Sequence, residues 1–251
     1  MMKSVSLAFL AGFFMLASPI YADELVSVKL GYQVLTPSGT YSGNGSLDTS
    51  IDIEKDLDFA NSEKFTSEVA LSYGDSHLSL GYMPIKTSGQ GNTAGLTFNG
   101  QTFTGSISGE IDVNLYDLGY TYYLVNMDDL PTRLQLGLEV AVKIFDGEAS
   151  ISGSVAGLTT SESVSGTAPI PTVGARGRIA LGDFFGVKAR AGYMSYSGNN
   201  FLDAEAQLEF SPLPLIGLYA GYRMIDIEVD EFDGLLDIQF SGPFAGALVR
   251  F

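Results

Sequence analysis

The chain has 251 residues, which is enough for one large domain or two small ones. Its 30 glycines, 16 phenylalanines and 13 tyrosines, with only 17% charged residues, are not the composition of a disordered chain. The absence of cysteine excludes disulfides and thiolate metal sites. The formal net charge of −16 makes nucleic acid a poor partner, because nucleic acid requires a basic face, and leaves divalent cations and basic partners open.

Residues 1–22 have the pattern of a secretory signal peptide. Lys3 supplies the positive start, an apolar run extends from Val5 to Leu16, and the segment ends on a small residue, Ala22. The run is shorter than the roughly 20 apolar residues that a transmembrane helix needs. We therefore expect cleavage after Ala22 and a mature domain of residues 23–251.

After Ala22 the dominant hydrophobic period is two. Residues 134–142 alternate leucine or valine with polar or small residues, and residues 26–34 and 202–210 do the same. Alternation over about ten residues predicts strands with one apolar and one polar face. The apolar face points into the core of a soluble sandwich, but toward lipid in a transmembrane barrel.

The spacing of turns favours the barrel, because short turns alternate with longer or more polar connections. The short turns are expected near residues 74–75, 127–130, 182–183 and 211–214, and the other connections at 47–63, 87–101, 148–166, 198–200 and 230–234. The segments between them predict about ten strands, near residues 25–46, 63–73, 76–87, 104–125, 132–147, 167–181, 184–197, 200–210, 215–229 and 235–251. An even number places both termini on the periplasmic side, and eight strands are the alternative.

Aromatic residues on the apolar faces fall into two rows, as at the two interfaces of a membrane. The row at the short-turn ends is Tyr73, Tyr122, Phe185, Phe210 and Phe251. The row about one membrane thickness away is Tyr32, Phe65, Tyr82, Tyr116, Tyr193 and Tyr222. A soluble core gives no reason for sorting aromatic residues by height along the strands.

The turns also predict strand register. A two-residue turn at Gly74–Asp75 pairs the flanking Tyr73 and Ser76, whereas the turn at Gly182–Asp183 must hold an odd number of residues to keep the apolar faces together. A turn at Gly198–Asn199 sets Lys188 opposite Glu209 and Arg190 opposite Gln207. The strand over 104–124 changes parity near Leu115, which indicates a bulge or an upper half outside the membrane.

The inward faces of the predicted barrel carry many ionic side chains, which must pair in a dry lumen. The predicted lumenal network is Arg133, Glu139, Lys143, Arg176, Arg178, Lys188, Arg190, Asp203, Glu205 and Glu209, with Asp117 and Glu68 beside it. A salt-bridged plug is the favoured interpretation, because barrels of eight to ten strands leave little continuous lumen. The lining of a small pore is the alternative.

Enzymatic chemistry has little support in the sequence. The one histidine, His77, lies beside the Gly74–Asp75 turn at the periplasmic end, away from the outer rim where barrel hydrolases act, and is interpreted as an ordinary polar-face residue. No nucleotide-binding or zinc-protease motif occurs, and we expect no cofactor.

Acidic residues cluster in the outer connections. Asp52, Glu54, Asp56 and Asp58 alternate, and on a strand they would project to one side. They predict a weak divalent-cation site, which could bridge to lipopolysaccharide phosphates, as does a second cluster from Glu228 to Asp233. A solvated acidic surface is the favoured alternative.

The chain ends on a strand whose last residues are Gly246-Ala247-Leu248-Val249-Arg250-Phe251. This ending resembles the C-terminal β-signal of Gram-negative outer-membrane proteins, carried here by Gly246, Val249 and Phe251. The resemblance implies that the barrel assembly machinery is a partner.

A wider resemblance is carried by Gly221-Tyr222-Arg223, the acidic hairpin 226–237, Gly242-Pro243-Phe244-Ala245-Gly246 and the acidic segment 51–58. The chain resembles an uncharacterised family of small Gram-negative outer-membrane β-barrels, similar in style to OmpA-like and OmpW-like barrels. The resemblance implies fold and location.

We therefore expect an all-β, up-and-down antiparallel transmembrane β-barrel in the outer membrane, in contact with lipid and lipopolysaccharide. The expected role is non-enzymatic, either structural or in surface interaction. A narrow pore for small solutes is the second hypothesis, and an outer-membrane hydrolase is a distant third.

Overall fold

The computed structural model describes residues 25–43, 50–98, 101–127, 132–155, 158–182, 184–213, 215–231 and 234–251, so the expected signal peptide lies outside the described residues. No helix within these ranges has the length and hydrophobicity to cross a membrane.

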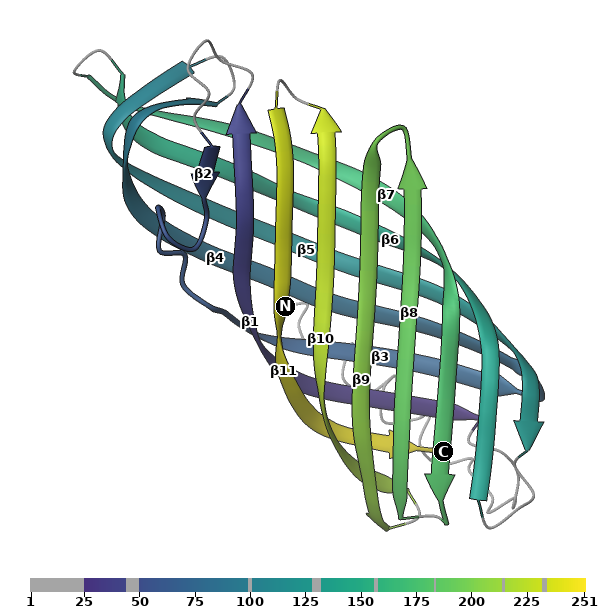
Figure 1. The fold of residues 1–251 in the computed structure, drawn as a ribbon. Coiled ribbons are helices and arrows are strands. Elements are labelled where there is room, and N and C mark those ends of the chain that lie inside the picture. The colour runs from purple at the N-terminus through teal and green to yellow at the C-terminus, as the bar shows by residue number, and fades with distance from the viewer. Residues whose placement is uncertain are drawn as a thin grey trace, which may run out of the picture.

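Ten of the described strands form a closed, up-and-down antiparallel barrel, in which β11 returns to pair with β1 (Figure 1). They are β1 (Val26–Gly43), β3 (Ser62–Tyr73), β4 (Ser76–Phe98), β5 (Gln101–Met127), β6 (Thr132–Val155), β7 (Leu158–Leu181), β8 (Phe185–Tyr196), β9 (Asn199–Leu213), β10 (Ile216–Glu231) and β11 (Gly234–Arg250). An additional short strand, β2 (Ser50–Asp52), pairs only with the far end of β1. The predicted fold class is confirmed with ten strands rather than eight.

Two of the expected long connections are strands instead. β4 continues to Phe98 and β5 begins at Gln101, where the sequence predicts a loop over 87–101. In the same way β6 continues to Val155 and β7 begins at Leu158, within the predicted loop 148–166. The outward faces of these hairpins carry serine, threonine and acidic side chains, so they lack the apolar alternation that reveals a lipid-facing strand.

Pairing across the short turns agrees with two of the register predictions. Tyr73 pairs with Ser76, as expected for a turn at Gly74–Asp75. Leu181 pairs with Phe185, which confirms an odd number of residues in that turn.

The predicted turn between β8 and β9 is wrong by one residue. Tyr196 pairs with Asn199, so the turn is formed by Ser197 and Gly198, whose φ angles are 52° and 88°. Positive φ at both central positions is the type I′ geometry, which matches the twist of the flanking strands. The inward faces are unchanged, but every cross-strand partner differs from the predicted one by two residues.

The barrel has two sections of opposite polarity. In the lower section, where β1 begins and β11 ends in Figure 1, outward side chains are apolar and inward side chains are polar or charged. In the upper section the inward side chains are apolar. β5 shows both arrangements, because Asp117 and Thr121 are buried inside the lower section, while Leu115 and Phe103 are buried inside the upper section.

This inversion explains the change of parity near Leu115. β4 and β5 pair in continuous register from Ser76–Tyr122 to Thr93–Gly105, so the expected bulge at this point is wrong. Odd-numbered residues of β5 face inward on both sides of Leu115, and only the chemical character of each face changes.

Two rows of exposed aromatic side chains bound the apolar belt, at the positions expected from the sequence. In the upper row the Tyr82 hydroxyl donates to Asn114 Oδ1 at 2.7 Å, so the polar end of the ring points away from the belt. Tyr116 of the same row stands between the inward-facing Asp117 and Leu115. The outside and the inside of the barrel therefore change polarity at the same height, as expected where a barrel leaves a membrane.

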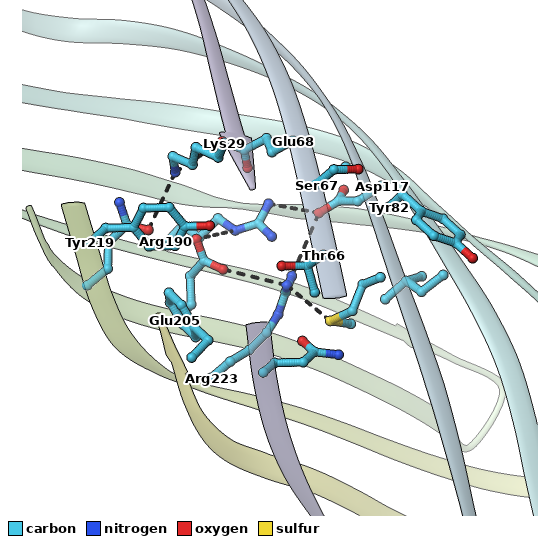
Figure 2. A pocket seen from close by; sticks show the side chains of 16 residues that line it. Lys29, Thr66, Ser67, Glu68, Tyr82, Asp117, Arg190, Glu205, Tyr219 and Arg223 are labelled. Atoms are coloured by element: carbon cyan, nitrogen blue, oxygen red, sulfur yellow. Dashed lines mark hydrogen bonds and ion pairs between the residues drawn. The ribbon is translucent and has the colours of Figure 1, made fainter. Parts of the chain in front are cut away.

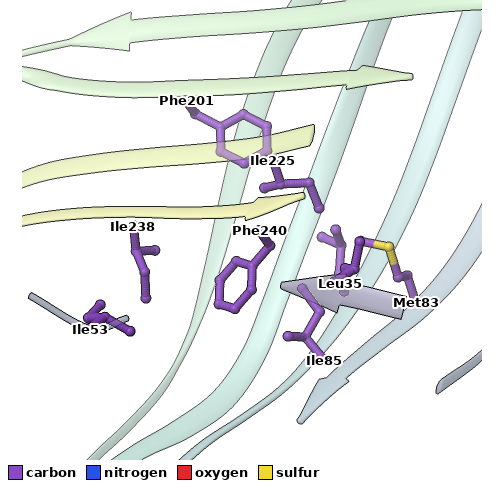
Figure 3. Close-up of a cluster of buried hydrophobic side chains, with 9 residues drawn as sticks. Leu35, Ile53, Met83, Ile85, Phe201, Ile225, Ile238 and Phe240 are labelled. Carbon is purple, nitrogen blue, oxygen red and sulfur yellow. The ribbon is translucent and has the colours of Figure 1, made fainter. Parts of the chain in front are cut away.

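An apolar core fills the upper section (Figure 3). Its buried members are Leu35, Ile53, Met83, Ile85, Leu115, Phe201, Ile225, Ile238 and Phe240. Apart from Ile53, they come from strands on opposite sides of the barrel, so the upper section packs as two facing sheets, as in a soluble β-sandwich.

Residues 53–62, here called the inserted segment, fold into the top of the barrel. Ile53 and Leu57 are buried in the apolar clusters, and the Ala60 N–H donates to the Ser88 carbonyl of β4 at 3.0 Å. β4 pairs with β3 only as far as Tyr82. The inserted segment therefore covers part of an edge that β4 would otherwise expose.

Candidate functional site

The ten charged residues predicted to face the lumen all stand at inward positions of the lower section. Glu139, Lys143, Arg176, Arg190, Asp203 and Glu209 are buried, and Arg133, Arg178, Lys188 and Glu205 are partly buried.

Ion pairs in the middle of the lumen join opposite walls of the barrel. Lys143 Nζ of β6 lies 2.7 Å from Asp117 Oδ2 of β5 and 2.5 Å from Asp203 Oδ2 of β9. Arg223 of β10 donates to both carboxylate oxygens of Asp203, at 3.0 and 2.9 Å. Arg190 Nη1 of β8 reaches Asp117 Oδ2 at 2.8 Å, as Figure 2 shows. Side chains from five strands therefore meet across the lumen.

Two of the ion pairs between β8 and β9 follow the corrected register. Arg190 is directly opposite Glu205, and its Nε lies 3.2 Å from Glu205 Oε1. Lys188 is opposite Gln207 but reaches Glu209 diagonally, with Nζ 3.1 Å from Oε1.

Glu209 is the centre of a second cluster, nearer the lower rim. Its Oε2 lies 2.8 Å from Arg250 Nη2 and 3.4 Å from Arg178 Nη2. Arg250 also donates to the Ser211 hydroxyl at 3.0 Å. This cluster ties β7, β8 and β9 to the last strand of the chain.

His77 belongs to a third cluster on the opposite wall. Arg176 Nε donates to Glu139 Oε2 at 2.7 Å, and the Thr121 hydroxyl donates to the same oxygen at 2.9 Å. His77 is buried beside them, 2.9 Å from the Ser72 hydroxyl and 3.4 Å from Arg176 Nη1. It therefore lies inside the lower section, far from the upper rim.

Three lumenal cations are absent from the predicted network. Lys29 lies 3.1 Å from Glu68, and Arg223 and Arg250 make the contacts described above. Each of them stands at an inward position of an alternating strand, so the same period of two identifies them. In the sequence Arg223 and Arg250 also belong to short motifs.

Space between these clusters is limited. A cavity of about 60 Å³ lies among Lys29, Glu68, Asp117, Arg190 and Tyr219 (Figure 2). One water molecule needs about 10–15 Å³ of such a cavity, so the cavity has room for a few waters but not for a solute with its hydration shell. The charges are held by one another rather than by bulk water, which makes each one costly to remove.

The acidic outer segment does not have the geometry on which the cation prediction depends. Residues 53–57 form turns rather than a strand, so alternate acids do not project to one side. Asp52 accepts bonds from the backbone N–H groups of Glu54 and Lys55, and its carboxylate lies 2.6 Å from Lys55 Nζ. These contacts lower the pKa of Asp52, the ion pair with Lys55 most strongly. Among the described residues no three acidic or histidine side chains are grouped to hold a metal ion.

The C-terminal residues close the barrel. Phe251 N–H donates to the Val26 carbonyl at 2.8 Å, and Val26 N–H donates back to Phe251 at 3.2 Å. Gly246 lies where any Cβ would meet the Leu30 carbonyl, so only glycine fits between β11 and β1. Val249 pairs with Val28 across the same seam.

No family model and no curated protein matches this chain. Among solved structures, the outer membrane protease OmpT of Escherichia coli aligns over 94% of this chain and 99% of that chain, with a TM-score of 0.59 and 11% identity. Ail, the attachment invasion locus protein of Yersinia pestis, aligns over 90% of this chain and 99% of that chain, with a TM-score of 0.38 and 13% identity. Neisserial surface protein A aligns over 90% of this chain and 97% of that chain, with a TM-score of 0.32 and 13% identity.

The similarity to OmpT concerns the fold alone at this level of identity. Together with the apolar belt, the two aromatic rows and the closed ten-strand sheet, it defines the class. The chain has the fold of Gram-negative outer-membrane β-barrel proteins.

Proposed function

We propose that this chain is a non-enzymatic outer-membrane protein whose lower section spans the membrane and whose lumen is closed to solutes. Its upper section then stands outside the cell as a rigid platform for interaction with other molecules. The observation that carries the proposal is the wall-to-wall contact of Lys143, Asp117, Asp203 and Arg223, beneath an apolar core.

This position implies lipid, lipopolysaccharide and the barrel assembly machinery as partners, with both termini in the periplasm. The exposed leucines and valines of the belt support contact with lipid acyl chains. Weak divalent-cation binding by the acidic outer segment stays a prediction.

Planar-bilayer recording tests the closed lumen. The wild-type protein is expected to give no stepwise conductance, because Lys143 and its partners occupy the cross-section. The matched variant is the triple substitution Lys143→Ala, Asp203→Ala and Arg223→Ala, which removes the bridge and leaves the apolar core above it, so conductance by this variant alone would show that the bridge rather than the core closes the lumen. Stepwise conductance by the wild-type protein would support the pore hypothesis instead.

The non-enzymatic part of the proposal is supported by the position of His77. Its buried ring contacts Ser72 and Arg176 within the lumen and has no open surface beside it for a macromolecular substrate. A hydrolytic activity of the purified protein that His77→Ala abolishes would contradict this part.

A further inference from the structure

β7 rises far beyond its neighbour β8. It pairs with β6 along its whole length, from Leu158 to Leu181, but with β8 only from Val173 downward. Within the described ranges no other strand pairs with residues 158–172 on that side. In Figure 1 β7 forms the upper margin of the slanted sheet β4–β7. We call residues 158–168 the free edge.

The two margins of this sheet differ in whether another segment covers them. The margin at β4 is covered by the inserted segment, through the bond from Ala60 to Ser88. The free edge has no such cover in the described part of the chain. Natural sheets normally shield long edges with charge, proline or a covering segment, because an open edge is a template for another strand.

Two prolines reveal which backbone groups of β7 point away from β6, within the plane of the sheet. Proline cannot donate to a ladder, so Pro169 and Pro171 must direct their nitrogens away from β6. The other odd-numbered residues share this direction, because backbone groups of a strand alternate sides. The free edge therefore presents the N–H groups of Thr159, Ser161, Ser163, Ser165 and Thr167, and the prolines end it below.

The side chains of the free edge favour one kind of added strand over others. The inward row includes Val164 and Leu158, which are 44% and 75% exposed and large enough to pack against apolar neighbours on an added strand, and between them Glu162, which adds a negative charge. The outward row is serine and threonine, which bring no charge. The protein as a whole carries a net charge of −16, which disfavours pairing with a second copy and favours a segment with basic residues.

We propose that the free edge of β7 binds an extended, basic polypeptide segment of another protein as an added antiparallel strand. This inference rests on the proposed function, because it needs the upper section to stand outside the cell. The segment alternates apolar residues, which pack beside Val164 and Leu158, with basic residues on its other face. Backbone hydrogen bonds supply the attachment, and the alternation supplies the register.

The test uses the full mature protein in lipid nanodiscs and a synthetic peptide of about ten residues that alternates valine with lysine. The key variant is Ser163→Pro, which removes one N–H that points away from β6, in the middle of the free edge, and leaves the ladder to β6 intact. The matched control is Ser163→Ala, which loses the hydroxyl but keeps the N–H. A second probe is the same peptide with backbone N-methylated lysines, which carries the same charge but cannot donate to the ladder, because the lysines are the residues opposite the N–H groups that β7 presents.

Calorimetric titration is expected to show equal affinity for the wild type and Ser163→Ala, and affinity lower by about 10-fold or more for Ser163→Pro. The N-methylated peptide is expected not to bind. Equal binding of both peptides, or of all three proteins, would overturn the proposal, because charge attraction alone then explains it. Because the N-methylated peptide is tested on the wild type, the result does not depend on folding of the proline variant.

Self-association that Ser163→Pro abolishes would overturn the choice of partner in favour of a second copy. Conductance recorded on the same wild-type preparation separates the two proposals. A conducting protein contradicts the closed lumen whether or not the peptide binds, and a silent protein that ignores the peptide contradicts only the free-edge proposal.

Discussion

Lys143 illustrates how the lumen is held together at the scale of single residues. Its side chain is 2% exposed and neutralises Asp117 and Asp203, which come from strands on either side of the lumen. Lys188 also makes an ion pair, but its side chain is 19% exposed. Its partner Glu209 still has Arg250 as a second cation when Lys188 is removed. Asp117 and Asp203 likewise keep Arg190 and Arg223, so the two lysines differ chiefly in how deeply their ion pairs are buried.

Lys143→Met is expected to destabilise the barrel by about 3–5 kcal/mol, because it leaves buried carboxylates without their shared cation. Lys188→Met is the matched control, and its cost should be clearly smaller. Urea unfolding in detergent, followed by the loss of the compact form on unboiled gels, measures both. Equal losses of stability in the two variants would show that burial of the ion pairs has no influence.

Asp226 lies on the outer face of the upper section, half-buried and close to other acids. Burial raises the pKa of Asp226 above its usual range, and the charges of Asp237 and Glu228 raise it further. A raised pKa in the folded protein means that the stabilising contribution is complete below the unfolded value of about 3.9 and is lost as pH rises through the folded value.

Asp226→Asn is therefore expected to stabilise the protein at neutral pH, since it removes a charge that the fold disfavours. The gain should shrink as the pH falls through the raised pKa of Asp226, where the wild-type carboxyl takes up its proton. Thermal unfolding of both proteins across this pH range checks the sign. A gain that stays constant with pH would mean that the substitution acts through packing or hydrogen bonding.

At the scale of elements, the inserted segment depends on glycines of the strands that it covers. A Cβ on Gly89 of β4 would collide with the Leu57 carbonyl and the ring of Phe59. A Cβ on Gly109 of β5 would lie 2.8 Å from the far side of the same ring. Gly166 of β7 has no atom within 4 Å of its Cβ position and supplies a neutral comparison.

Gly89→Ala is expected to loosen the inserted segment without opening the lower section. Hydrogen exchange measured by mass spectrometry should become faster over residues 53–62, while Gly166→Ala should leave it at the wild-type rate. Unchanged exchange in Gly89→Ala would mean that the segment does not rely on close contact with β4.

Much of the architecture could be predicted from the hydrophobic period. Alternation over residues 134–142 and 202–210 assigned each side chain to the lumen or the lipid, and it identified Glu139 and Asp203 as inward-facing. That works because a membrane enforces an apolar face on every strand that crosses it. The pattern loses this power in the upper section, where Phe98 and Val155 mark strand ends that were predicted as loops.

The remaining features are set by long-range contacts or by fine turn geometry. The turn Ser197–Gly198 differs from the predicted turn by one residue, and both choices keep the same faces inward, so polarity could not distinguish them. The inserted segment is anchored by Ile53 and Leu57, whose neighbours come from distant strands. Its alternating acids look like a strand in sequence although they form turns.

At the scale of the whole molecule, one closed sheet has two sections whose outer surfaces suit different solvents. The lower section is apolar outside and ionic inside, and the upper section is polar outside and apolar inside. The row of tyrosines that includes Tyr82 and Tyr116 marks the boundary on the outer surface. A sheet of this kind fits a membrane only with the lower section in lipid and the upper section in water.

Cysteine labelling of intact cells tests this placement most directly, because the sequence has no native cysteine. Ser163→Cys lies in the upper section and Asp75→Cys in a short turn of the lower rim. A membrane-impermeant maleimide is predicted to label Ser163→Cys on intact cells, and Asp75→Cys only after the outer membrane is disrupted. Labelling of Asp75→Cys but not Ser163→Cys on intact cells, or recovery of the protein in the soluble periplasmic fraction, would contradict the account.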